Sequence, residues 1–152
     1  MDMTFRFTTD TASIAVFDVQ ALQHRLDDRA DWWSLPSEEL LELNRGNLVI
    51  VGLGVDGTYS CHVHDGPLQG HSNAVSARVR CISDRLFVGP GENIVGGGLT
   101  PALEFGGAFV QVGPGNYLVQ IQLNGPDEVE VAINSVEGSG DNSFTEPLFV
   151  EW

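Results

Sequence analysis

Residues 47–66 read Asn-Leu-Val-Ile-Val-Gly-Leu-Gly-Val-Asp-Gly-Thr-Tyr-Ser-Cys-His-Val-His-Asp-Gly, and this stretch decides the fold class. Its first part, residues 47–53, is almost entirely apolar, as expected of a strand that is covered on both faces. Residues 58–64 alternate between apolar and polar side chains, which predicts a strand with one face in the core and the other in solvent. The Asp56-Gly57 pair between them favours a tight turn, so we expect a β-hairpin.

The same alternation recurs along the rest of the chain. Further strands are predicted over 75–81, 117–123 and 128–133, and a final edge strand over 147–152. Residues 4–17 at the N-terminus also read as extended. Many short alternating strands without interspersed helices favour two packed antiparallel sheets.

Helical spacing is confined to the region just before Gly46. Asp18 is placed to begin a helix over 19–31, and a second helix is expected over 37–44, with Gly46 positioned to end it. The sequence therefore predicts a mainly β protein with one domain over 1–152. Its expected fold is an antiparallel, jelly-roll-like β-sandwich with two short N-terminal helices.

Charge restricts the partners of this chain more than any motif restricts its chemistry. The 152 residues include 21 aspartates and glutamates but only seven arginines and no lysine, which gives a formal net charge of −14. Such a surface repels phosphate backbones and anionic lipid, and it attracts basic proteins. We therefore expect a basic protein partner, and neither nucleic acid nor a membrane.

Cysteine usage and the termini indicate the compartment. No run approaches the roughly 18 apolar residues that a membrane span needs, and the N-terminus lacks the pattern of a signal peptide. Cys61 and Cys81 are too few for a disulfide framework, and their spacing fits neither a zinc pair nor a redox pair. We expect buried, reduced thiols in a cytoplasmic protein, with a homodimer left open.

An acidic segment in the two expected helices is the first candidate site. A tryptophan beside carboxylates is a plausible interface anchor, although a tryptophan can equally close the gap between a helix and a sheet. The candidate partner-binding residues are Asp27, Asp28, Asp31, Trp32, Glu38, Glu39 and Glu42.

Three histidines form the second candidate site. His62 and His64 flank one residue of a strand and so project from the same face, and His71 follows closely. Three imidazoles could ligate a transition metal. The His-x-His pattern resembles the metal motif of cupins, but the later histidine and the downstream glutamate of that motif are missing. Two polar residues on a solvated sheet face are the simpler interpretation.

No cofactor or catalytic set is expected. Residues 52–57 match Gly-x-Gly-x-x-Gly, yet a dinucleotide site needs a helix after the glycines, and a strand is predicted there. Ser60 and His62 share a face without the turn or the oxyanion hole of a serine hydrolase. The sequence thus favours a protein that is not an enzyme.

Four segments together carry a family resemblance. They are Asp-Trp-Trp at 31–33, Leu-Gly-x-Asp-Gly-x-Tyr at 53–59, Leu-Phe-Val-Gly-Pro-Gly-Glu at 86–92 and Val-Gly-Pro-Gly-Asn-Tyr-Leu-Val at 112–119. They resemble a family of small, uncharacterised bacterial all-β proteins, and the Pro-Gly-x-Tyr-x-Val ending is similar to one in competence-type nuclease inhibitors. Because these motifs are turns, the resemblance implies a fold and a bacterial origin but no catalytic residues.

Three functions follow as hypotheses. The first is an acidic, non-enzymatic binding protein, an immunity or inhibitor-type partner of a basic bacterial protein, since acidic surfaces accelerate the capture of basic partners. The second is a metal-binding β-fold or enzyme that uses His62, His64 and His71. The third is a module for a small ligand or carbohydrate that uses Trp32 and the glycine-rich stretch 89–107.

Overall fold

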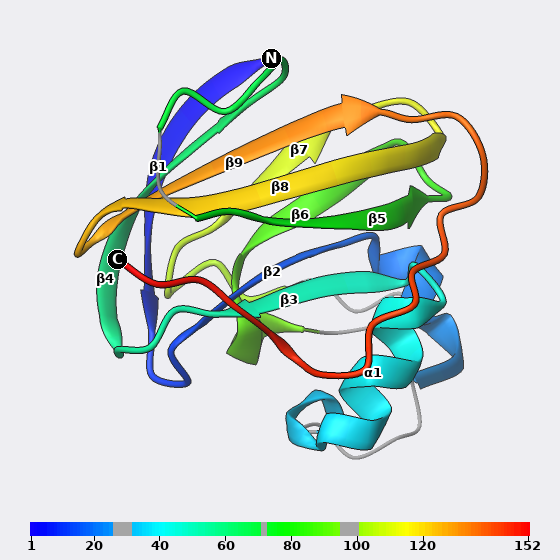
Figure 1. The fold of residues 1–152 in the computed structure, drawn as a ribbon, viewed down its shortest axis with the longest axis horizontal. Helices are drawn as coiled ribbons and strands as arrows, with labels where there is room; N and C mark the ends of the chain where they lie inside the picture. The colour runs from blue at the N-terminus through cyan, green and yellow to red at the C-terminus, as the bar shows by residue number, and fades with distance from the viewer. Residues whose placement is uncertain (26–31, 71–72, 95–100) are drawn as a thin grey trace.

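The computed structural model describes residues 1–25, 32–70, 73–94 and 101–152, and it is mainly β (Figure 1). Ten strands form two five-stranded sheets. The first sheet has the order β1 (Asp2–Thr9), β4 (Gly57–His64), β9 (Glu128–Ser135), β8 (Gly115–Gly125), β5 (Val75–Cys81). The second sheet has the order β10 (Leu148–Phe149), β3 (Leu48–Gly52), β2 (Ser13–Phe17), β6 (Arg85–Pro90), β7 (Ala108–Gln111).

The two sheets share one apolar core. Alternate residues of the first sheet, such as Cys61, Val63 and Val131, meet Val16 and Val49 of the second sheet in a single buried cluster. The period-two alternation read from the sequence selects these inward-facing side chains correctly. Both cysteines are buried and free, which confirms that expectation, and burial raises the pKa of the Cys81 thiol to about 11.

The second sheet is also covered on its outer face. Leu48 and Ile50 of β3 and Phe87 of β6 pack there against Trp32 and Trp33 in a second buried cluster. The cover consists of the 3₁₀ helices η1 (Val19–Arg25) and η2 (Trp32–Ser34), followed by the α-helix α1 (Pro36–Asn44). In Figure 1 these helices lie on the side of the second sheet away from the first sheet, and a further 3₁₀ turn, η3 (Gly91–Asn93), follows β6.

Two details correct the predicted antiparallel topology. β4 runs parallel to β9, and β10 runs parallel to β3, while the other strand pairs are antiparallel. The Asp56-Gly57 turn does not close a hairpin, because β3 and β4 belong to different sheets. The chain crosses from one sheet to the other at this turn. The jelly-roll connectivity stays a prediction.

The first predicted helix also differs. Residues 19–25 form a 3₁₀ helix that is kinked at Leu22 (φ −110°, ψ 17°), and residues 26–31 lie outside the described part. Asp18 begins the segment as expected, since its Oδ1 accepts a hydrogen bond from the Gln20 backbone N–H at 3.0 Å. The kink accompanies the complete burial of Leu22 against the second sheet. None of the helices in the described residues is long and apolar enough to span a membrane.

The end of α1 depends on Gly46, which adopts the left-handed conformation (φ +73°). Its N–H donates to the Leu43 carbonyl, and the Asn47 N–H donates to the Glu42 carbonyl, which is the Schellman arrangement. A Cβ atom at Gly46 would lie 2.0 Å from the Gly140 carbonyl oxygen. The helix end and the segment before β10 are therefore packed directly against each other.

We predict that Gly46→Ala destabilises the protein by about 3 kcal/mol, because it adds a backbone clash to the cost of a positive φ. Gly54→Ala is the matched control, since Gly54 has φ +86° with no atom within 4 Å of a Cβ. That variant should lose only about 1 kcal/mol. Urea unfolding measures both values, and equal losses would contradict the packing described at Gly46.

Candidate functional site

The acidic segment predicted to bind a partner is only partly available at the surface. Asp27, Asp28 and Asp31 lie outside the described residues. Trp32 is 6 % exposed and packs in the outer cluster of the second sheet, with the Arg25 guanidinium 4.4 Å from its ring centroid. The role of Trp32 in partner binding stays a prediction. Trp32 fills the gap between the helical cover and the sheet, which is the other interpretation that the sequence left open.

Glu42 is fully buried and holds the cover together. One of its oxygens, Oε2, contacts His24 Nε2 at 2.5 Å and accepts from Arg25 Nε at 3.1 Å. The other oxygen accepts from Asn47 Nδ2 at 2.9 Å. Burial raises the pKa of Glu42, but the hydrogen bonds from Asn47, His24 and Arg25 outweigh it and lower the pKa below its usual value. Glu42 therefore fastens η1 to α1.

Glu38 and Glu39 remain partly exposed on α1. Glu38 accepts a hydrogen bond from the Arg25 guanidinium at 2.8 Å. Glu39 lines a groove beside Trp33 and Phe149, and burial raises the pKa of Glu39 to about 7. Close to neutral pH, Glu39 therefore carries only part of a negative charge.

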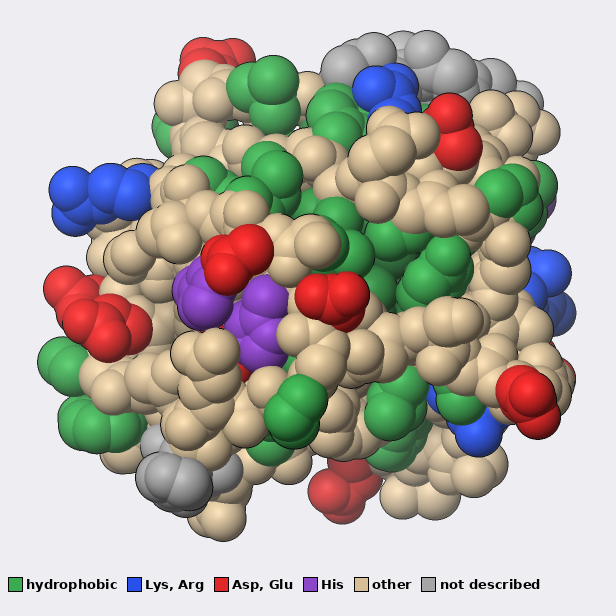
Figure 2. All heavy atoms as spheres, turned by 90° about the horizontal axis from the view of Figure 1, so that it is seen from above, with side chains coloured by type: hydrophobic (Ala, Val, Ile, Leu, Met, Phe, Trp, Pro, Cys, Tyr) green, Lys and Arg blue, Asp and Glu red, His purple; other side chains and the backbone are tan. Residues whose placement is uncertain are grey.

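The predicted histidine pair does come together, on the outer face of the first sheet. The rings of His62 and His64 are 4.8 Å apart, and Figure 2 shows histidine side chains side by side among carboxylates. His62 Nε2 lies 2.7 Å from Asp2 Oδ1 on the neighbouring strand β1. His71 lies outside the described residues.

A buried carboxylate, Glu130, completes this network. His64 Nε2 lies 2.6 Å from Glu130 Oε2, and the His64 Nδ1 atom lies 2.6 Å from the Asp65 carbonyl oxygen. Glu130 also accepts hydrogen bonds from Gln122 and Asn124 of β8. Its remaining donors are the backbone N–H groups of Gln69 and Gly70, at 2.6 and 3.0 Å.

The network shifts both ionisable groups toward their charged forms. Burial raises the pKa of Glu130, but hydrogen bonds from Asn124, the Gln69 N–H and His64 lower it to about 2. Burial lowers the pKa of His64, yet its bond to the Asp65 carbonyl and its pairing with Glu130 raise it above the usual value. The pairing of Glu130 with His64 thus favours the charged form of each, and the Gln69 and Gly70 N–H groups that donate to Glu130 tie the segment after β4 to the sheet.

This geometry favours a structural role over a metal site. Both ring nitrogens of His64 already have protein partners. Within residues 1–25, 32–70, 73–94 and 101–152, no group of three histidines, cysteines or carboxylates is arranged to hold a metal ion.

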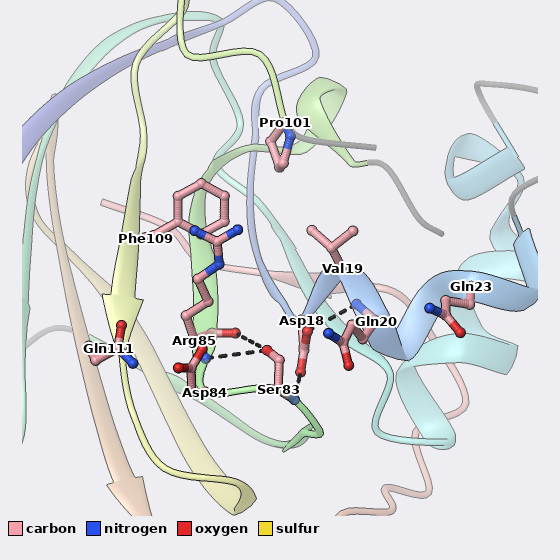
Figure 3. Close-up of a pocket in the computed structure, with 10 residues that line it drawn as sticks. All are labelled: Asp18, Val19, Gln20, Gln23, Ser83, Asp84, Arg85, Pro101, Phe109 and Gln111. Carbon is pink, nitrogen blue, oxygen red and sulfur yellow. Dashed lines mark hydrogen bonds between the residues drawn. The ribbon is translucent and has the colours of Figure 1, made fainter. Parts of the chain in front are cut away.

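A polar groove of about 510 Å³ lies between η1 and strands β6 and β7 (Figure 3). The Arg85 guanidinium lies 4.0 Å above the centroid of the Phe109 ring, and Gln20, Gln23 and Gln111 contribute amide groups. Below them, buried Asp18 accepts hydrogen bonds from the Ile82 and Ser83 N–H groups, both at 2.7 Å. The groove can offer amide groups and one guanidinium to a polar ligand.

A family model described as a family of unknown function, DUF6386, matches residues 1–150. The chain belongs to this family. The match confirms the resemblance to a family of uncharacterised proteins that the turn motifs indicated. Comparison with curated protein sequences finds no match.

Two solved structures have a similar fold. One is titled "Crocagin biosynthetic gene J", with 13 % sequence identity and a TM-score of 0.54. The other is ComJ from Bacillus subtilis, titled an inhibitor of the DNA degrading activity of NucA, with 8 % identity and a TM-score of 0.54. Each alignment covers 90 % of this chain and 96 % of the other chain. The second similarity confirms the resemblance to competence-type nuclease inhibitors at the level of the fold.

Sequence reasoning missed Glu130 in this DUF6386 protein. Its alternation with Val129 and Val131 places it on the polar face of β9, so its side of the sheet was readable. Its neighbour was not, because β4 and β9 pair across more than sixty residues, with His62 opposite Glu130. A glutamate on the polar phase of a strand, together with amide residues on the adjoining strand, was the only available signal.

Glu39 makes stability depend on pH, because burial raises its pKa to about 7. Because its folded pKa lies above the unfolded value of 4.5, ionisation of Glu39 destabilises the fold, and stability falls as the pH rises from 4.5 to 7. We expect Glu39→Gln to raise the melting temperature relative to wild type at pH 8 and to change it little at pH 4. Exposed Glu104→Gln controls for the loss of one charge, and thermal unfolding at both pH values checks the difference.

Glu130→Gln should destabilise the protein by about 3 kcal/mol, because it leaves His64 without its buried counter-ion. The His64 contribution is complete below pH 6.5 and is lost as the pH rises through its raised pKa. The Glu130 contribution is complete above pH 4.5 and is lost as the pH falls toward about 2. The difference from wild type should therefore be largest between pH 4.5 and 6.5.

The measurements are urea unfolding across that range and NMR titration of the His64 ring, whose pKa should fall in the variant. Glu128→Gln, an exposed position two residues away on the same strand, is the matched control and should leave both readouts unchanged. An unaltered His64 titration in Glu130→Gln would show that the two groups are not paired.

Proposed function

We propose that this protein is a non-enzymatic, acidic binding protein of the inhibitor or immunity type, and that it captures a basic protein partner. The observation that carries the proposal is the net charge of −14 on a folded β protein. A field of this strength raises the encounter rate with a positively charged partner. The fold it shares with ComJ, whose title names it an inhibitor of NucA, supports a protein partner.

Four ionisable side chains that might have supported catalysis are buried and hydrogen-bonded within the fold. His64 and Glu130 are nearly inaccessible, with side-chain exposures of 5 % and 1 %. Glu42 and Asp18 are likewise buried and hydrogen-bonded. Because a general acid or base must reach its substrate, these groups support the binding hypothesis over the enzyme hypothesis.

We further propose that the acidic segment steers the partner without anchoring it. Glu38 supplies charge on α1, Asp27, Asp28 and Asp31 add theirs from the stretch of sequence between η1 and η2, and Glu39 adds to it as the pH rises. Trp32 and Glu42 are left out of the contact, because both are buried. Steering needs only the field of these charges and places no demand on the fit between surfaces.

A second candidate function is that of a small-ligand module. The groove beside η1 favours it, since the Arg85 guanidinium lies over the Phe109 ring and three glutamine amides border the same space. A stacked guanidinium keeps its N–H edge free to bind a carboxylate or phosphate group. Trp32, which the sequence suggested as part of a ligand-binding module, packs in the interior instead.

The main proposal predicts a steep salt dependence. With a basic partner recovered by pull-down from the source cell, the association rate should fall about tenfold or more between 50 and 500 mM salt, while dissociation changes little. Replacing Asp27, Asp28 and Asp31 together by asparagine should slow association. The matched control removes the same charge elsewhere in the chain, through Asp84→Asn, Glu104→Gln and Glu137→Gln combined. Stopped-flow kinetics measures both rates, and salt-independent association would contradict the proposal.

A further inference from the structure

A further groove, of about 350 Å³, lies at the end of the molecule where three segments meet. They are the crossing from β3 to β4, the turn between β8 and β9, and the C-terminal residues, all found near the C label in Figure 1. We name it the C-terminal groove and define it by its apolar lining residues Leu53, Val55, Leu123, Pro126, Val150 and Trp152. It lies within the described residues.

The C-terminal groove has fixed walls and an exposed rim. Val150 is 4 % exposed and donates its N–H to the Gly52 carbonyl at 3.0 Å, which anchors the chain on which Trp152 follows. Val55 and Trp152, by contrast, are 68 % and 69 % exposed. Large apolar side chains that gather around a depression and stay open to water mark an interaction site more often than isolated ones do.

Carboxylates surround this apolar surface. Glu151 is the one charged residue among those that line the C-terminal groove. Asp56 and Asp127 lie on two of the segments that form it, and both raise the pKa of Tyr59, next to burial as the main cause. The Tyr59 hydroxyl donates to the Val55 carbonyl at 2.5 Å. Asp56 and Asp127 directly follow the lining residues Val55 and Pro126, and the Asp127 carbonyl accepts a hydrogen bond from the Ser60 N–H at 2.9 Å, so both aspartates lie beside the groove.

We propose that the C-terminal groove is the docking site for the basic partner, an inference that rests on the proposed function. An apolar side chain of the partner enters between Val55 and Trp152, and lysines or arginines beside it face Asp56, Asp127 and Glu151. An apolar anchor within a polar rim is the usual arrangement of an energetic centre in a protein interface. The charge of the rim selects a cationic segment.

The same charges argue against a second copy of the chain as the occupant. A two-fold contact would place the same patch on both subunits, so the carboxylates of the rim would face one another. The net charge of −14 adds to that repulsion. A basic segment meets neither penalty.

The test uses the full chain and a blocked peptide of sequence Lys-Arg-Leu-Leu-Arg-Lys. Trp152 is the one exposed tryptophan of the three, since Trp32 and Trp33 are buried, so acrylamide quenching reports on the groove. The peptide should shield Trp152 in a saturable way and shift the amide resonances of Gly54 and Val55. Matched peptides with serines for the leucines, or glutamates for the basic residues, should do neither.

Variants then locate the contact. Val55→Ser, or Asp56→Asn with Asp127→Asn, should weaken peptide binding about tenfold. Ile82→Ser with Asp84→Asn changes an exposed apolar residue and a carboxylate elsewhere and should have no effect. Thermal unfolding verifies that each variant is folded.

Several results would overturn the inference. They are absence of binding, equal binding by the serine peptide, resonance shifts confined to another face, and shielding of Trp152 that rises with protein concentration alone. The last result would assign the groove to a second copy. If the peptide binds here but no basic protein is recovered from the cell, the proposed function fails while the docking chemistry stands. If a recovered partner binds these variants as tightly as the wild type, the docking inference fails while the proposed function stands.

Discussion

The second sheet has two apolar faces, and the rest of the structure is arranged around covering both of them. β2 and β3 are buried along nearly their whole length. One face is covered by the first sheet, through residues such as Val16 and Val49. The other needs its own layer, which the short helices and their tryptophans provide. An apolar sheet face left in water would forfeit the main free energy that stabilises the fold.

That second layer is held by polar contacts as well as by apolar packing. Buried polar side chains fasten it at defined points: Glu42 joins η1 to α1, and Asp18 joins the start of η1 to the turn before β6. Each carboxylate has several donors around it, so burial does not leave an unpaired charge. The first sheet differs, because its outer face is polar. There Glu130 accepts hydrogen bonds from the Gln69 and Gly70 N–H groups and so holds the segment after β4 to the sheet.

The sequence predicts well what depends on neighbouring residues. The unbroken apolar run at 48–52 indicates a strand covered on both faces, and β3 is such a strand. The alternation at 58–64 assigns Tyr59, Cys61 and Val63 to the core, where they lie. The local pattern does not indicate which strands pair with each other. The parallel pairing of β4 with β9 and the meeting of His64 with Glu130 both follow from long-range topology, and a strand pattern is silent on partners.

The expected direction of the Trp32 side chain differs from the observed one for a related reason. Helical spacing accounts for Trp33 as a core residue and leaves Trp32 on another side, but the chain at 32–34 forms a 3₁₀ turn, in which both rings reach the second sheet. From the sequence, Glu42 is also expected at the surface with the other acidic residues. Its hydrogen-bond partners Arg25 and His24 are more than fifteen residues away along the chain. The burial of both residues has the same cause. In a thin layer of short helices, contacts with the sheet beneath decide which side chains are buried, and helical periodicity does not reveal those contacts.

Burial also decides which carboxylates can act on a partner. Asp18, Glu42 and Glu130 contribute to the formal charge but are enclosed and compensated by hydrogen bonds or by His64, His24 and Arg25. The long-range field therefore comes from the exposed acids, which lie on several faces and so set the rate of encounter more than its geometry. Charge of this kind cannot by itself define one binding pose. A pose needs a place where apolar surface is open and shaped, and the C-terminal groove has both properties together with an acidic rim. The proposed steering and the proposed anchoring are thus separable: the first needs only exposed charge, and the second needs the C-terminal groove.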